Sequence, residues 1–304
     1  MIEAKGLRKR YRKKVAVDDI SFNVETGKVT GFLGPNGAGK STTMRLMLGL
    51  DAGGGHTTFD SKELSHYLQP SKVVGILLEA KAFHPTRSAR NHLRILAAAG
   101  GIADSRVDEV LEIVGLSDVA KKKPGKFSLG MSQRLGIAAA ILGEPKYLML
   151  DEPANGLDPE GIAWLRQFLK DYADAGNAVF VSSHLLSEMS QMADNVVVIG
   201  RGKLIADLSV ADFIAKSAHA GVRVRSPKLS ALERRMKAKD WRLDKQGDSI
   251  VVGGATTDEI GKLAFEIGVP LYELANQQAS LEDAFLELTA GSEEYHAKSQ
   301  ETDK

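Results

Sequence analysis

Residues 34–42 have the types and spacing of a loop that binds phosphate groups. They fit the pattern G-x-x-x-x-G-K-[ST] at every fixed position. Glycines let backbone N–H groups turn inward around phosphate oxygens, and a following helix directs its positive end at the same anion. We expect a nucleoside triphosphate to be bound by Gly34, Pro35, Asn36, Gly37, Ala38, Gly39, Lys40, Ser41 and Thr42.

Two side chains of this loop have specific expected roles. Lys40 would reach the terminal phosphates, and the hydroxyl of Ser41 would be a ligand of Mg²⁺. The alternative is a glycine-rich turn that binds nothing. The apolar stretch 29–33 before the loop and the helical apolar spacing after it favour the phosphate-binding interpretation.

Two acids and a histidine follow apolar stretches that are typical of buried strands. Asp151 and Glu152 end the stretch 147–152, and His184 follows the stretch 179–183. Parallel sheets bind ligands at the carboxyl ends of their strands. We expect Asp151 to hold Mg²⁺ through water, Glu152 to orient the attacking water, and His184 to contact the γ-phosphate. The alternatives are two solvated acids and a structural histidine.

Tyr11 and Glu79 are further candidates, and each has an ordinary alternative. Tyr11 lies in the basic segment 9–14 before the phosphate loop, so its ring could stack on adenine or could pack at a hairpin tip. Glu79 ends the apolar run 73–79 and could face Mg²⁺ or water, or be a surface charge at a strand end.

The segment 128–134 precedes an apolar helix expected over residues 135–142. Ser128 and Gly130 occupy positions where an N-cap residue and a small residue would open this helix. A phosphate could bind at such a helix N-terminus. Taken without further context, an ordinary capped helix is the simpler interpretation.

The composition limits the class of protein. The chain has 304 residues, a net charge of +1, 43% hydrophobic residues and no cysteine. These values fit a globular protein in a reducing compartment and give no indication of a nucleic-acid partner. Neither an N-terminal signal segment nor an apolar run of about 20 residues is present. A membrane process would therefore need another chain for the membrane part.

The elements that must position these residues indicate an α/β fold. We expect a first domain over residues 1–215, with a helical insertion over about 80–142. Residues 216–290 follow the order β-α-β-β-α-β-α, which suggests a small ferredoxin-like accessory domain without a catalytic constellation. Its last helix would begin with a capping box at Ser280. Residues 291–304 are polar and are expected to be disordered.

The order of these motifs over residues 2–215 resembles the ATP-binding subunit of an ABC transporter, in the branch of drug and bacitracin-type exporters. The resemblance implies the P-loop ATPase fold and hydrolysis of ATP with Mg²⁺. It also implies a head-to-tail homodimer in which Ser128 and Gly130 of one copy complete the site of the other. Asp158, in the turn 155–159, would lie at that interface.

The resemblance further implies a separate membrane permease, contacted by the helical insertion, and a peripheral location on the cytoplasmic face of the membrane. The exported cargo would be a drug, a peptide antibiotic or a lipid-like compound. A soluble ABC-class ATPase acting on ribosomes or DNA is the alternative. It is disfavoured because the chain has one ATPase cassette and no long coiled coil. A nucleotide-binding regulator without turnover is disfavoured by the presence of both Glu152 and His184.

Two positions depart from the family pattern. The family motif Leu-Ser-Gly-Gly-Gln corresponds here to Phe-Ser-Leu-Gly-Met over residues 127–131, so the final Gln is absent. Glu79 stands where the family has Gln, which contacts Mg²⁺ and senses the membrane partner. A carboxylate there would change the charge beside the metal and the coupling of hydrolysis to transport.

Overall fold

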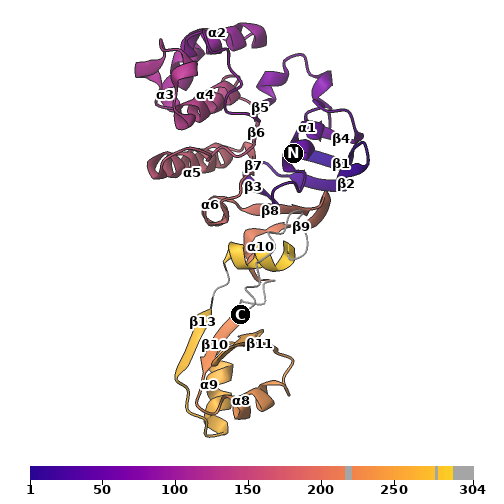
Figure 1. The fold of residues 1–304 in the computed structure, drawn as a ribbon, viewed down its shortest axis with the longest axis vertical. Coiled ribbons are helices and arrows are strands. Elements are labelled where there is room, and N and C mark those ends of the chain that lie inside the picture. Colours follow the sequence, from indigo (N-terminus) through magenta and orange to yellow (C-terminus); the bar gives the residue numbers. More distant parts are fainter. Residues whose placement is uncertain (216–220, 278–279, 290–304) are drawn as a thin grey trace, which may run out of the picture. The chain divides into compact units, whose positions relative to one another are not determined.

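The computed structural model describes residues 1–215, 221–277 and 280–289. The chain divides into two compact units, with the division between Asp207 and Leu208 (Figure 1). This division lies before the expected boundary at residue 215, because helix α7 (Val210–Ala215) packs against α10 (Leu281–Thr289) in the second unit. The tail expected to be disordered, residues 291–304, lies outside the described residues.

A six-stranded sheet forms the centre of the first unit. Its strands are β3 (Lys28–Leu33), β5 (Val74–Leu77), β6 (Tyr147–Leu150), β7 (Ala178–Ser182), β8 (Asn195–Gly200) and β9 (Lys203–Ser209). They lie in the order β5-β6-β7-β3-β8-β9, and the neighbours from β5 to β8 are parallel. Every residue of β6 and β7 is buried, as in a parallel sheet covered on both faces.

The register of this sheet places the segments with the candidate site residues at one edge. Phe32 pairs with Ser182, and Leu150 pairs with Val181. Because these strands are parallel, the segments that follow β3, β6 and β7 leave the sheet at the same edge. Those segments contain the phosphate loop, the two acids and His184.

A second, antiparallel sheet completes the core of the first unit. Its strands are β1 (Ile2–Tyr11), β2 (Lys14–Val24) and β4 (Gly54–Phe59), in the order β2-β1-β4. Phe22 of β2 stacks on Phe32 and Phe180 of the parallel sheet, with ring centroids 5.8 and 5.4 Å apart. Helix α1 (Lys40–Met47) buries Met44 and Met47 in the same cluster. This packing fixes the position of the helix that follows the phosphate loop.

The expected helical insertion is present beside β5. It consists of α2 (Ala89–Gly100), α3 (Ser105–Ile113) and α4 (Leu129–Ile141), which pack against one another (Figure 1). Ser128 is the N-cap of α4, as expected, and the segment 129–134 before the apolar stretch 135–142 is already helical. Helices α5 (Pro159–Asp174) and α6 (Leu186–Met192) follow β6 and β7. Four 3-10 helices are η1 (Leu64–His66), η2 (Pro70–Lys72), η3 (Ser117–Val119) and η4 (Pro124–Lys126).

The second unit contains an antiparallel sheet with helices. Besides α7 and α10, its elements are β10 (Gly221–Arg225), α8 (Leu229–Met236), β11 (Arg242–Gln246), β12 (Ser249–Gly253), α9 (Thr257–Glu266) and β13 (Glu273–Gln277). The strand order is β11-β12-β10-β13, and side chains of α8 and α9 share its apolar core. From β10 to α10, the element order is the expected one.

The last helix of the second unit begins as expected. The capping box at Ser280 is confirmed: the Ser280 hydroxyl accepts from the Asp283 N–H at 3.0 Å, and the Ser280 N–H donates to the Asp283 carboxylate at 2.9 Å. Within residues 1–215, 221–277 and 280–289, no helix combines the length and apolar character needed to cross a bilayer.

Candidate nucleotide-binding and hydrolysis site

The phosphate loop connects β3 to α1, and its backbone requires glycine. Gly39, the N-cap of α1, has φ 107°, and a Cβ there would lie 2.5 Å from the carbonyl oxygen of Ala16. A side chain at this position would therefore be strained and would collide with β2. The loop thus places its backbone in a conformation that suits the expected anion-binding role.

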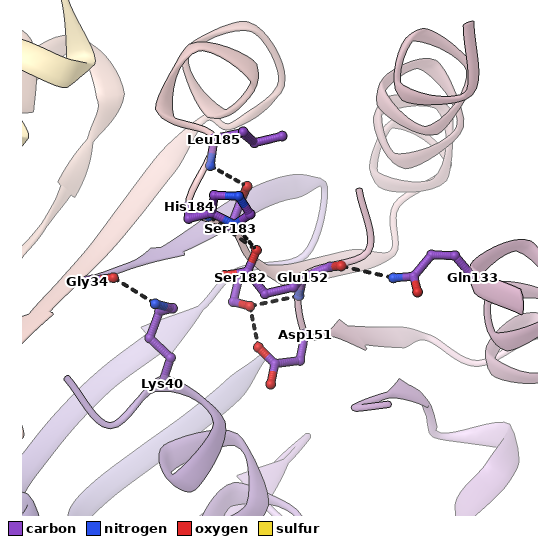
Figure 2. A network of polar contacts seen from close by, with 9 residues as sticks. All are labelled: Gly34, Lys40, Gln133, Asp151, Glu152, Ser182, Ser183, His184 and Leu185. Atoms are coloured by element: carbon purple, nitrogen blue, oxygen red, sulfur yellow. Dashed lines mark hydrogen bonds and ion pairs between the residues drawn. The ribbon is translucent and has the colours of Figure 1, made fainter. Parts of the chain in front are cut away.

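Lys40 is held inside this loop. Its side chain is largely buried, and its Nζ donates to the carbonyl oxygen of Gly34 at 2.7 Å (Figure 2). Burial lowers the pKa of Lys40, while the charges of Glu152 and Asp151 act in the opposite direction. A poorly solvated cation beside open space is arranged to interact with an anion that enters that space.

A cavity of about 410 Å³ lies over the loop. It is lined by Tyr11, Lys14, Ala16, Pro35, Asn36, Gly37, Gly39, Lys40, Ser41, Thr42, Asp151 and Glu152. The structure therefore brings the expected adenine-stacking ring, the phosphate loop and the acidic pair to one cavity. Gly34 contributes to the loop through its carbonyl bond with Lys40, and Ala38 is buried.

Two of the three residues expected to bind Mg²⁺ line this cavity. The Ser41 hydroxyl and the Asp151 carboxylate both line it, and both are the hard oxygen donors that Mg²⁺ prefers. Within the described part of the chain, no group of three or more His, Cys, Asp or Glu residues could hold a metal by itself. This donor set suits an ion that takes most of its ligands from nucleotide phosphates and water.

Glu79, the third expected metal ligand, lies apart from this set. It follows β5 at the expected strand end, its side chain is exposed, and it is not among the residues that line the cavity. The structure does not bring Glu79 together with Ser41 and Asp151.

The acidic pair is connected to β7 through Ser182. The buried hydroxyl of Ser182 donates to the Asp151 carboxylate and accepts from the backbone N–H of Glu152 at 2.9 Å (Figure 2). One side chain thus orients one acid and the backbone of the other.

Replacing Ser182 by Ala should lower the rate of ATP hydrolysis by about tenfold, because both acids lose a buried hydrogen-bond partner. The Michaelis constant for MgATP should change less than the turnover number. Steady-state phosphate release checks this, with the exposed Ser187→Ala as the control. Equal rates for S182A and wild type would show that this contact does not orient the acids.

Glu152 and His184 form a close pair. His184 Nδ1 lies 2.6 Å from Glu152 Oε2, and the His184 backbone N–H donates to the same oxygen at 3.3 Å. An ionised carboxylate only accepts, so Nδ1 carries the proton and Nε2 remains for another partner. Glu152 also has φ 50°, an uncommon conformation for a residue that is not glycine.

Charged residues contact both the hydroxyl and the ring of Tyr11. Its hydroxyl donates to Asp51 at 2.9 Å, and this bond raises the pKa of Tyr11. Arg45 holds the same carboxylate at 3.0 Å. Lys9 Nζ lies 4.9 Å from the ring centroid. Tyr11 is 48% exposed and lines the cavity, so its ring has surface available for a base.

Ser128, Gly130 and Asp158 do not line the cavity of their own chain. Ser128 caps α4 by accepting from the Met131 N–H at 3.1 Å, and Asp158 caps α5 by accepting from the Gly161 N–H at 2.9 Å. A Cβ at Gly130 would lie 2.8 Å from the carbonyl oxygen of Gly156. The two capped helix starts are therefore closely packed through this glycine.

Sequence reasoning missed several residues of the site. Gln133 donates from Nε2 to the carbonyl oxygen of Glu152 at 2.9 Å, and Lys14 and Ala16 line the cavity. Ser182 lies two residues before His184, and a polar residue in an otherwise apolar strand end is a usable signal. Lys14 lay in the basic segment already noted. Nothing in the sequence connected Gln133 to Glu152.

Comparison with known proteins adds the family context. A model described as ABC transporter matches residues 17–155, and a model described as a domain of unknown function (DUF8746) matches residues 220–282. The chain is 36% identical to the bacitracin transport ATP-binding protein of Bacillus licheniformis, over 96% of this chain and 98% of that protein.

Solved structures share the fold. The structure of an ATP-binding subunit of an ABC transporter has a TM-score of 0.61 and 23% identity, and the match covers 87% of this chain and 99% of that chain. The dimeric structure of a post-hydrolysis state of an ATP-binding cassette, bound to ADP and Pi, has a TM-score of 0.63 and 21% identity. That match covers 69% of this chain and 98% of that chain.

Proposed function

Because the chain belongs to the ATP-binding proteins of the ABC transporter family, we propose that it binds and hydrolyses MgATP to power a separate membrane permease. One observation carries the proposal. A single cavity is lined by a phosphate loop with a buried lysine and by two acids that follow β6 at the same sheet edge, one of which is paired with a histidine. This set supplies charge stabilisation, metal ligands and a base at one place.

Each residue of the site has its own role in the proposed reaction. Lys40 and the loop N–H groups bind the phosphates, and Ser41 and Asp151 hold Mg²⁺, which when bound stabilises charge on the phosphate oxygens. The carboxylate of Glu152 orients the attacking water and accepts its proton. With a proton on each ring nitrogen, His184 would donate from Nδ1 to Glu152 and from Nε2 to the transferred phosphate. Tyr11 stacks on the adenine ring.

A second copy of the chain would complete the site. Ser128 and Leu129 are exposed at the N-terminal end of α4, and neither lines the cavity of its own chain. Helix N-termini bind anions through free N–H groups and the helix dipole. The dimeric cassette with the same fold supports a pair of chains. In a head-to-tail dimer, Ser128 and Gly130 of one copy would contact ATP held by the other, with Asp158 at the interface.

An apolar groove supports docking of the permease on the helical insertion. A cavity of about 760 Å³ lies between the end of α1, the segment 64–76, α2 and α4. Its lining includes Leu48, Leu50, Leu64, Leu68, Ile76 and Leu96, and Leu68 is fully exposed. A groove of this kind fits a short helix or loop of a partner protein. We assign this partner to the permease, which would place the chain on the cytoplasmic face of the membrane.

The test is co-purification from detergent-solubilised membranes of the native host. The tagged chain should bring with it a protein with several membrane-spanning helices, and Leu68→Glu should weaken this association at least tenfold without affecting MgATP binding. Leu204→Glu, at another partly exposed leucine, is the control. Recovery of ribosomes or DNA, with no membrane protein, would instead support the soluble ATPase alternative.

For the cargo, we propose classes of compound and not a single compound. The relative whose printed name refers to bacitracin transport matches this chain over nearly its whole length. We therefore propose export of a peptide antibiotic, a drug or a lipid-like compound. Deletion of the gene should lower the concentration of the relevant antibiotic that inhibits growth, and the plasmid-borne gene should restore it.

Glu79→Gln tests whether residue 79 acts at the metal when ATP is bound. If residue 79 reaches the metal when ATP binds, MgATP binding should be retained and hydrolysis should rise by up to about fivefold, since one charge a few ångström away is worth ~1 kcal/mol in water. The measurement is phosphate release as a function of Mg²⁺ concentration, with Glu63→Gln, another exposed glutamate, as the control. Unchanged kinetics would place residue 79 away from the metal.

A further inference from the structure

The backbone of Glu152 has an uncommon conformation that neighbouring groups must hold. Its φ is 50°, and it precedes Pro153, which itself restricts the preceding residue. Residues in sparsely populated backbone regions persist only where the surrounding structure over-determines them. The question is which groups fix Glu152, because its carboxylate is the proposed base.

Two buried side chains hold the peptide groups of Glu152 from opposite directions (Figure 2). Ser182 of β7 accepts from the Glu152 N–H at 2.9 Å. Gln133 of α4 donates from Nε2 to the Glu152 carbonyl oxygen at 2.9 Å. Ser182 belongs to the strand that leads to His184, whereas Gln133 comes from the helix that begins at Ser128.

The contact from Nε2 to the Glu152 carbonyl oxygen explains why a glutamine is present at position 133. The residue is 2% exposed, and its Oε1 has no hydrogen-bond partner in the part of the chain that the structure describes. A buried unpaired amide oxygen is unfavourable, so apolar packing alone would be better served by an apolar side chain. Turning the amide would place Oε1 against the Glu152 carbonyl oxygen. The Nε2 contact is therefore the feature that distinguishes glutamine from an apolar residue here.

Helix α4 and the turn that contains Glu152 also touch at a second point. A Cβ at Gly130 would lie 2.8 Å from the Gly156 carbonyl oxygen, and a Cβ at Gly156 would lie 2.4 Å from the side chain of Leu129. The start of α4 therefore packs on the turn at Gly156, while Gln133 bonds it at Glu152. These contacts make α4 a support for the turn.

We propose that Gln133 is a positioning residue for Glu152 and that it acts within its own chain. This inference rests on the proposed function and deepens it. In a head-to-tail dimer, α4 presents Ser128 to the ATP of the other copy, while Gln133 fixes the base that acts on the ATP of its own copy. Gln133 thus connects the two ATP sites through one helix.

The experiment uses two differently tagged full-length chains assembled on the proposed permease, which keeps each pair together, and purified through both tags. The reference dimer pairs a wild-type chain with Glu152→Gln, so that one base remains. The cis dimer pairs Gln133→Met with Glu152→Gln, so that the remaining base lacks its own Gln133. The trans dimer pairs wild type with the double variant Q133M/E152Q, so that the remaining base keeps its own Gln133.

The expected result is a turnover number about tenfold lower than the reference in the cis dimer only, with a Michaelis constant for MgATP within about twofold. The trans dimer should match the reference. Gln167→Met, at an exposed glutamine of α5, is the matched control and should leave both constants unchanged.

Other outcomes overturn the inference. A cis dimer with the reference rate would show that the Nε2 contact does not position the base. Equal losses in both dimers would indicate a general packing role, and a loss confined to the trans dimer would assign Gln133 to the other site. Wild-type chains that do not hydrolyse ATP would overturn the proposed function as well, whereas normal wild-type hydrolysis with any of these patterns overturns only the role of Gln133.

Discussion

Replacing Glu152 by Gln is expected to reduce ATP hydrolysis by about a thousandfold. The amide keeps the size of the side chain but cannot accept a proton from water. The change also replaces the carboxylate that lies 2.6 Å from His184 Nδ1 with a neutral acceptor, so the histidine keeps a partner. Phosphate release with purified chain and permease measures the rate.

Binding must be measured in the same E152Q protein. The dissociation constant for MgATP should stay within about threefold of wild type, since the phosphate loop and Lys40 are unchanged. Glu160→Gln, an exposed acid at the start of α5, is the control for removal of one charge. Full residual hydrolysis by E152Q would remove Glu152 from the role of base.

Replacing Lys40 by Met should weaken MgATP binding by about a hundredfold or more. The ammonium group is the buried cation of the cavity, and its present partner is a neutral carbonyl oxygen. In a poorly solvated site, a phosphate gains more from such a charge than it would in water. Binding of a fluorescent ATP analogue measures the affinity.

The same K40M variant should lose affinity for MgATP without losing thermal stability in the absence of ATP. Burial lowers the pKa of Lys40, which means that its charge is poorly solvated before ATP binds. The melting temperature without ATP should therefore not fall, whereas the increase that MgATP gives to wild type should disappear. Lys28→Met, at a partly exposed lysine of the first unit, is the control. K40M that still binds ATP tightly would contradict the assigned role.

The strand–loop–helix arrangement of the phosphate loop was predictable from sequence because it depends on local residues. Gly39, Lys40 and Ser41 are consecutive, and their proposed roles follow from one strand, one turn and one helix start. The common edge for Asp151, Glu152 and His184 was also predictable, because parallel strands end together. The N-cap at Ser128 was predicted as well, although α4 begins earlier than the apolar spacing indicated.

The contacts that hold the base were not predictable from a single sequence. Ser182 and Gln133 reach Glu152 from distant parts of the chain, and only the tertiary fold brings the three together. The positive φ of Glu152 has no local signal, since Pro153 does not indicate it. Glu79 shows the opposite case: its place at a strand end was predictable, but its exposure outside the cavity was not.

The central claim is that each ATP is enclosed between two copies of this chain. Light scattering coupled to size-exclusion chromatography of E152Q tests it most directly, with and without ATP. We expect a mass of 32.7 kDa without nucleotide and twice that mass with ATP, with two nucleotides bound per dimer. The ATP-dependent dimer should be lost when Ser128→Arg is added. A mass of 32.7 kDa under both conditions, with ATP bound to the single chain, would contradict it.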